Sequence, residues 1–88
     1  MNKINDEFKI FGIIPYIAPE VLRGLGNTKA ADIYSFGILM WEILTGDKPY
    51  KDQPHDIHLV FKIIDGLRPT IPEGTPDDYI SLMQKCWH

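Results

Sequence analysis

The sequence predicts a mainly α-helical fold arranged around one central helix. Residues 30–46 carry apolar side chains on every side of a helical wheel. A helix of that kind has to be buried on all sides, so we expect the other segments to wrap around it. Residues 18–22, residues 56–65 and the stretch from residue 75 onward also have helix-forming patterns, and they supply the surrounding elements.

Composition and charge restrict the class of protein. The 88 residues allow at most one small domain, expected at residues 10–88 after a flexible lead-in at 1–9. The net charge of −3 without a basic block argues against nucleic-acid partners. Cys86 is the only cysteine, which excludes an internal disulfide and favours a reducing compartment. The apolar run of about a dozen residues is too short to cross a membrane, so we expect a soluble cytoplasmic protein.

The first part of the domain contains helix-breaking residues. Gly12 and Pro15 predict an extended loop over residues 10–17, pressed against the core. Pro19 suits the first position of a short helix at residues 18–22. The glycine-rich stretch 24–27 ends that helix.

Residues at both ends of the 30–46 segment are typical of helix termini. Asn27 and Thr28 can each accept a hydrogen bond from an amide of the first turn. Asp32 lies near the positive end of the helix dipole. Gly46 suits the left-handed conformation that follows a helix. Within the segment, Ser35 and Glu42 are the residues that interrupt the apolar run.

A second amphipathic helix is predicted at residues 56–65. Its apolar residues at positions i, i+3, i+4 and i+7 form one stripe that we expect to face the core. Gly66 ends this helix. The flanking stretches 47–55 and 67–74 contain prolines and are expected to be loops. The residues of the stripe are Ile57, Val60, Phe61 and Ile64.

The last helix is expected to begin with a capping box. Thr75 would be the N-cap, Pro76 the first helical residue, and Asp78 would reach back to the cap. No stop signal precedes His88, so we expect the helix to run to the last residue, as if the domain were cut there. The apolar positions that repeat at helical spacing are Tyr79, Leu82, Met83 and Cys86.

Three motifs occur in an order that resembles a known family. Residues 15–20, Pro-Tyr-Ile-Ala-Pro-Glu, look like the end of a protein kinase activation segment. Residues 32–37, Asp-Ile-Tyr-Ser-Phe-Gly, are similar to the Asp-x-(Trp/Tyr)-Ser-x-Gly start of that family's central buried helix. Pro69 with Cys86-Trp87 resembles the later helices of the tyrosine-kinase-like group. Residues 8–88 therefore resemble the helical C-terminal lobe of a protein kinase, incomplete, with 1–9 as the end of an activation-loop-like segment.

The resemblance implies ATP-dependent phosphoryl transfer to protein hydroxyls in signalling, with ATP and Mg²⁺ as cofactors of a full-length parent. The parts that handle ATP do not occur in these residues. Gly24 and Gly26 begin a G-x-G-x-x-G pattern, but Lys29 stands where its last glycine belongs. There is no Val-Ala-Ile-Lys, His-Arg-Asp or Asp-Phe-Gly sequence. We therefore expect no catalytic, cofactor-binding or metal residues here, and no activity from the chain alone.

The resemblance assigns two sets of residues. It implies a substrate-peptide groove along Ile13, Ile14, Pro15 and Tyr16, and the Pro15-Tyr16 pair leans toward serine/threonine specificity. Asp32 would bind backbone amides of a catalytic loop, and Glu20 would pair with an arginine beyond residue 88. The residues that match structural motifs of the family are Ala18, Pro19, Glu20, Asp32, Gly37 and Trp87.

Other interpretations remain open at this level. The chain could be a non-catalytic protein-interaction module that uses the 56–65 helix and the 13–16 segment. It could be a marginally folded gene fragment, or associate with itself through apolar side chains left uncovered, such as Phe36, Met40 and Trp41. Two histidines and two aspartates could form a metal site, but solvated loop and helix-start roles are the better interpretation. Those four residues are Asp52, His55, Asp56 and His58.

Overall fold

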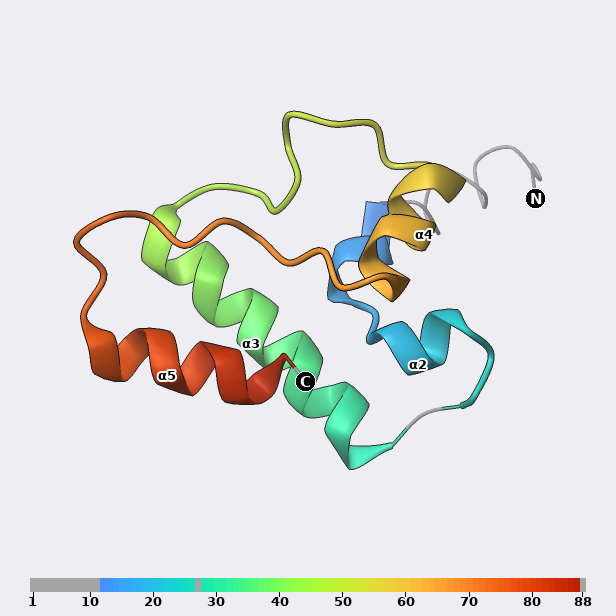
Figure 1. Cartoon of the computed structure of the whole chain (residues 1–88), viewed down its shortest axis with the longest axis horizontal. Helices are drawn as coiled ribbons and strands as arrows, with labels where there is room; N and C mark the ends of the chain where they lie inside the picture. Colours follow the sequence, from blue (N-terminus) through green and yellow to red (C-terminus); the bar gives the residue numbers. More distant parts are fainter. Residues whose placement is uncertain (1–11, 27, 88) are drawn as a thin grey trace.

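The computed structural model describes residues 12–26 and 28–87, and these form a helical assembly (Figure 1). No strand occurs among them, which confirms the mainly α-helical prediction. The lead-in expected at residues 1–9 lies outside the described residues. In chain order the elements are the 3₁₀ helix η1 (Ile14–Tyr16) and the α-helices α2 (Pro19–Leu22), α3 (Lys29–Thr45), α4 (Ile57–Ile64) and α5 (Asp77–Cys86).

The longest helix, α3, begins and ends where local chemistry predicts. The Thr28 hydroxyl oxygen accepts a hydrogen bond from the Ala31 amide at 3.1 Å. Gly46 follows the last residue with a φ of 70°, a conformation that a glycine adopts without steric cost. The alternative cap, Asn27, lies outside the described residues. Both termini of the central helix are therefore set by residues within four positions of its ends.

Two hydrophobic clusters divide the interior. The first joins α3 to α5, which lies alongside it in Figure 1, and contains Tyr34, Ile38, Trp41, Met83 and Trp87. The second lies where α4 packs against α2 and includes Ile14 of η1, at the other end of the molecule as seen in Figure 1. Its buried members are Ile14, Tyr50, Leu59, Val60 and Ile63.

The prediction that the central helix is buried on all sides is wrong for one of its faces. One side of α3 packs against α5 and η1, whereas large apolar residues on the other side remain exposed. Met40 and Trp41, two of the residues expected to be uncovered, are buried because α5 and its cluster cover them. The exposed residues of α3 are Ile33, Phe36, Leu39 and Ile43.

The limits predicted for α4 are confirmed, but the stripe predicted to be buried is only half correct, since Val60 is buried and Ile64 packs against the second cluster. Asp56 caps the helix by accepting from the amides of His58 and Leu59. Apolar residues occupy six of the eight helical positions, so their spacing alone does not select one face. The structure buries Leu59, Val60 and Ile63, and it leaves Ile57 and Phe61 of the predicted stripe exposed.

The start and end of α5 also differ from the prediction. The helix begins at Asp77, and the residue before it, Pro76, offers no side-chain cap. The Thr75 hydroxyl instead donates to the Pro72 carbonyl at 2.7 Å, so the capping box does not form. The helix ends at Cys86 and does not continue through Trp87; His88 lies outside the described residues.

The segment expected to be an extended loop contains a helical turn. Residues 14–16 form η1, with Pro15 in its first turn. The fixed φ of proline suits the beginning of a helical turn as well as an extended chain, so Pro15 did not exclude this outcome. The short helix α2 follows with Pro19 at its first position, as predicted.

Candidate functional site

The predicted substrate-groove residues lie on η1 and at its N-cap, Ile13, and they differ in exposure. Ile14 and Pro15 are buried, Tyr16 is half-buried and Ile13 is exposed. Ile14 belongs to the cluster formed with α4, which fixes the inner side of the turn. The segment therefore presents Ile13 and part of Tyr16 outward from a firmly packed base.

Two polar residues of α3 hold Tyr16 in place. The Tyr16 hydroxyl donates to the Glu42 carboxylate, and the Ser35 hydroxyl contacts both the Tyr16 carbonyl and, at 3.2 Å, the Ala31 carbonyl. The Lys48 ammonium lies 3.9 Å from the same Glu42 oxygen, although its side chain is mostly in solvent. These contacts couple η1 to the central helix.

The sequence carries a signal for this network of contacts around Tyr16. Ser35 and Glu42 are the two polar interruptions of the apolar run in α3, and they stand seven residues apart. That spacing places both side chains on one face of a helix. Buried polar groups need partners, so this pair indicated a polar contact with another segment.

The contact with Glu42 changes the acid–base behaviour of Tyr16. Burial, the hydrogen bond to Glu42 and the negative charge of that carboxylate raise the pKa of Tyr16 to about 12. Each effect disfavours the tyrosinate: burial removes its solvation, and the carboxylate repels it. The hydroxyl therefore remains a donor throughout the physiological pH range.

Glu42→Gln is expected to lower the pKa of Tyr16 toward its usual value of 10.0. The pKa of Tyr16 is higher in the folded chain than in the unfolded chain. The contribution of its neutral, hydrogen-bonded hydroxyl to the free energy of unfolding is therefore fully present below about pH 10. It is lost as the pH rises toward 12. Spectrophotometric titration of tyrosinate, with Tyr16→Phe to identify the transition, measures this. An unchanged titration curve in Glu42→Gln would contradict the assigned contact.

The residues that match the family motifs differ in burial: Ala18 of the Ala-Pro-Glu motif lies in the core, whereas Asp32 is exposed. Ala18 is buried in the cluster between α3 and α5, and Pro19 begins α2. Asp32 is exposed in the first turn of α3 and lines a hollow of about 210 Å³ together with Tyr16 and Ser35. Within the described residues, neither the Asp32 carboxylate nor that of Glu20 forms a hydrogen bond or ion pair.

Gly37 and Trp87 meet where α3 crosses the end of α5. A β-carbon placed on Gly37 would lie 2.6 Å from Cys86 Cβ and 2.8 Å from Trp87 Nε1. Trp87 is buried, and its indole packs in the cluster shared by the two helices. Gly37 is therefore a contact residue whose missing side chain permits the helices to approach.

Arg68 is a further organising residue, which the sequence did not indicate. Its guanidinium lies 5.1 Å from the centroid of the Tyr34 ring. Burial and the charge of Glu20 raise the pKa of Tyr34, while the positive charge of Arg68 opposes them. The side chain of Arg68 also donates to three carbonyl oxygens, those of Trp87 at 3.1 Å, Ile63 at 3.1 Å and Leu67 at 2.7 Å.

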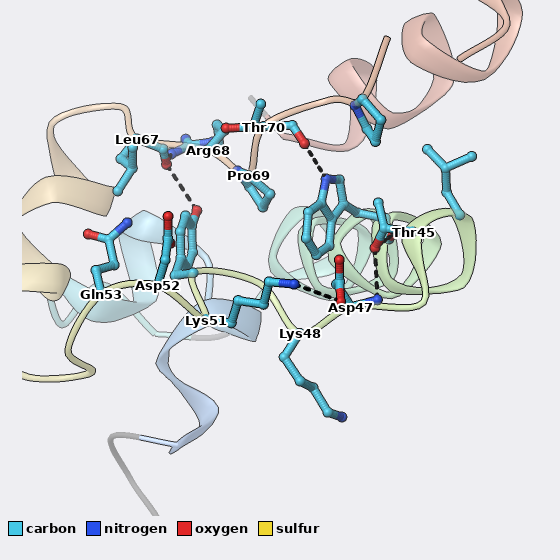
Figure 2. A pocket seen from close by; sticks show the side chains of 14 residues that line it. Thr45, Asp47, Lys48, Lys51, Asp52, Gln53, Leu67, Arg68, Pro69 and Thr70 are labelled. Atoms are coloured by element: carbon cyan, nitrogen blue, oxygen red, sulfur yellow. Dashed lines mark hydrogen bonds and ion pairs between the residues drawn. The ribbon is translucent and has the colours of Figure 1, made fainter. Parts of the chain in front are cut away.

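A larger pocket lies between the end of α3 and the two long loops (Figure 2). Its volume is about 540 Å³. The Trp41 indole donates to the Thr70 carbonyl across one side, and Lys51 forms an ion pair with Asp47 at 2.9 Å on the other (Figure 2). No glycine lines this pocket, and the Lys51 ammonium on its border is already paired with the Asp47 carboxylate.

Two of the four residues of the alternative metal site, His55 and Asp56, have other contacts. The His55 Nε2 atom lies 3.1 Å from the Tyr50 carbonyl oxygen, and the Asp56 carboxylate caps α4. Within residues 12–26 and 28–87, no group of three or more His, Cys, Asp or Glu could hold a metal ion.

Comparison with known proteins agrees with the helical lobe described above. The family model for protein tyrosine and serine/threonine kinases matches residues 4–88, and the chain belongs to this family. It is 40% identical over 77 residues to the serine/threonine-protein kinase mos of Patiria pectinifera, covering 86% of this chain and 22% of that protein. It is 39% identical over 88 residues to the receptor-interacting serine/threonine-protein kinase 4 of Mus musculus, covering 90% of this chain and 11% of that protein.

The chain spans a small part of the length of the curated relatives it matches. For the two kinases named above, the matched part is 22% and 11% of the relative. For the cyclic GMP-binding protein C of Dictyostelium discoideum, which is 41% identical over 75 residues, it is 3%. Among the helices of the described residues, none has the length and apolar character needed to cross a membrane.

Proposed function

We propose that the chain is a substrate-facing part of the C-terminal lobe of a tyrosine-kinase-like, serine/threonine-directed protein kinase, and that by itself it neither binds ATP nor transfers phosphate. The ordered set of motifs at residues 15–20, 32–37 and 86–87 carries this proposal. The lack of a phosphate-binding loop, a catalytic Asp and an Asp-Phe-Gly sequence supports the second part. ATP and Mg²⁺ would be bound by other residues of a parent kinase acting in intracellular signalling.

Within that role, η1 is proposed to present protein substrates to the reacting phosphate. Ile14 and Pro15 anchor the turn in the core, Ile13 is exposed, and Tyr16 is half-buried with part of its side chain accessible. The contacts of Tyr16 with Glu42 and Ser35 fix this surface relative to α3. Positioning is a main contribution of a protein to phosphoryl transfer, so a rigid turn suits the task.

The purified chain is expected to show no ATP binding and no phosphorylation of itself or of a general protein substrate. Fluorescent ATP-analogue titration with Mg²⁺ and transfer of labelled phosphate measure this, with an active serine/threonine kinase as the positive control. Saturable binding with a Kd below about 1 mM, or transfer above the level without protein, would contradict the proposal.

A second candidate function is a non-catalytic interaction module. The exposure of Phe61 and Ile57 on α4 favours it, because both side chains belong to one helical face and are not covered within the described residues. We expect any partner that uses this face to lose binding on Phe61→Asp and to retain it on Phe36→Asp. Affinity measurement with the identified partner decides this, and equal losses in both variants would count against the α4 face.

A further inference from the structure

Two aromatic side chains fix the walls of the pocket in Figure 2. The Trp41 indole donates to the Thr70 carbonyl at 2.8 Å, and the Tyr50 hydroxyl donates to the Leu67 carbonyl at 3.3 Å. Pro69 stands between the two acceptor residues in the chain and also lines the pocket. Because the polar atom of each ring is already bonded to the backbone, the rings offer carbon surface to the pocket.

Tyr50 has a backbone conformation that is rare for a tyrosine. Its φ is 56°, and among the described residues no other residue except glycine has a positive φ. Such a conformation is unfavourable for a residue with a β-carbon and persists where the surrounding contacts require it. Here the hydroxyl is bound to the Leu67 carbonyl, and His55 Nε2 lies 3.1 Å from the Tyr50 carbonyl oxygen. Because residues held in this way gather at binding sites, the pocket is a candidate for one.

An internal ion pair forms one polar edge of the pocket. The Lys51 ammonium lies 2.9 Å from the Asp47 carboxylate, and the two side chains are 62% and 48% exposed (Figure 2). An ammonium has three donors and a carboxylate has two oxygens, so the pair keeps a free donor and a free acceptor. A charged ligand would compete with this pairing. A neutral amide, which carries both an N–H and a C=O, can add to it.

The other charged residues of the lining do not favour an ionic ligand. Lys48 and Asp52 have opposite charges and are both exposed to solvent. The Arg68 guanidinium is already bound to three carbonyl oxygens. The pocket therefore combines apolar walls with a polar edge that suits an uncharged ligand.

From these observations we propose that the pocket binds an aromatic side chain in an extended, uncharged segment of a partner protein. The ring packs against Trp41, Tyr50 and Pro69, where aromatic side chains gain from offset or edge-to-face contacts. The backbone N–H and C=O of the same segment pair with Asp47 and Lys51. The volume of about 540 Å³ lies within the roughly 300–1,000 Å³ of ligand sites. This inference goes beyond the kinase role proposed above and does not depend on it.

A peptide titration followed by amide-detected NMR of the isotopically labelled chain tests the site. The probe is the uncharged peptide acetyl-Gly-Ser-Phe-Ser-Gly-amide. We expect saturable shifts of the Trp41 indole and of the Lys51 and Thr70 amides, with a Kd of about 0.1–1 mM. The same peptide with alanine in place of phenylalanine should bind at least about tenfold more weakly. Equal binding of the two peptides, no saturable shift up to about 5 mM, or shifts confined to α4 would overturn the proposal.

Two variants with matched controls locate the site on the protein. Lys51→Met removes the free donor and should weaken binding about threefold or more, whereas Lys85→Met on α5 should change it less than about twofold. Leu44→Trp fills the pocket and should weaken binding at least about tenfold. Its control is Leu82→Trp, because Leu82 is exposed and does not line the pocket. Circular dichroism checks folding, and if Leu44→Trp does not fold, the exposed lysine pair decides. An equal effect of a folded variant and its control contradicts the site.

Two further ligands separate the peptide from other sources of the same chemistry. N-acetyl-phenylalanine amide carries the ring with less backbone and should bind at least about threefold more weakly than the peptide. Replacing both serines of the peptide with lysine or with aspartate should tighten binding less than about threefold. If the single amino acid binds as tightly as the peptide, the site is one for small molecules. A larger gain for a charged peptide shows that charge selects the ligand. Either result overturns the proposal.

Discussion

Gly37→Ala is expected to destabilise the chain by about 1–3 kcal/mol, and Gly37→Leu by more. The added β-carbon would overlap Cys86 Cβ and the Trp87 indole, so α3 and α5 would have to separate. Alanine gains up to about 1 kcal/mol of helix propensity over glycine, and this offsets only part of the overlap. For a chain of this size, each kcal/mol corresponds to a fall in Tm of about 4–8 °C. Urea and thermal unfolding followed by circular dichroism measure the effect.

Gly12→Ala provides the matched control for Gly37. Among the described residues, an added β-carbon at Gly12 meets nothing within 4 Å, and Gly12 is exposed. The same exchange should therefore leave stability within about 0.5 kcal/mol of the original chain. If Gly37→Ala unfolds at the same urea concentration as Gly12→Ala, the close approach of α3 and α5 is not required for stability.

Arg68→Met is expected to destabilise the chain by about 2–4 kcal/mol. The substitution removes all three donors to the carbonyls of Ile63, Leu67 and Trp87, together with the cation over the Tyr34 ring. Hydrogen bonds from a charged donor contribute more than neutral ones, and half-buried carbonyls left unpaired add a desolvation cost. Denaturant unfolding measures the change in the free energy of unfolding.

Two variants separate the contacts of Arg68 from its charge. Arg68→Lys keeps the charge but lacks the planar fork that reaches several carbonyls, so it should recover only a part of the loss. Arg23→Met removes a positive charge from an exposed site at the end of α2 and should change stability by less than about 0.5 kcal/mol. Equal stability of Arg68→Met and Arg23→Met would show that the three carbonyl contacts contribute little.

Local chemistry predicted where most helices begin and end. Thr28 and Gly46 set the limits of α3, and Asp56 and Gly66 border α4, as the residue types indicated. Thr75 is an exception. Its hydroxyl could accept from a helix amide or donate to a nearby carbonyl, and in the structure it donates to the Pro72 carbonyl.

The candidate site was predicted only in part. The motifs identified residues 13–16, Ala18 and Gly37 as parts of the site, although not the helical turn at 14–16. They did not predict the contacts of Tyr16 with Glu42 and Ser35, which join segments 26 and 19 residues apart. Arg68 gave no signal, because its partners are backbone carbonyls, which every residue carries.

The sequence by itself determined the helical class, the family motifs and the ends of the central helix, because these depend on residues a few positions apart. Only the tertiary structure decided which face of each helix is buried. The apolar residues of α3 and α4 cover more than one face, and residues distant in the chain decide which face is buried. Trp41 is buried in the cluster that α3 shares with α5, whereas Phe36 is exposed. Ile63 is buried in the cluster that also contains Ile14 and Tyr50, whereas Phe61 is exposed. Burial is a property of the assembled surfaces and not of the pattern on one helix.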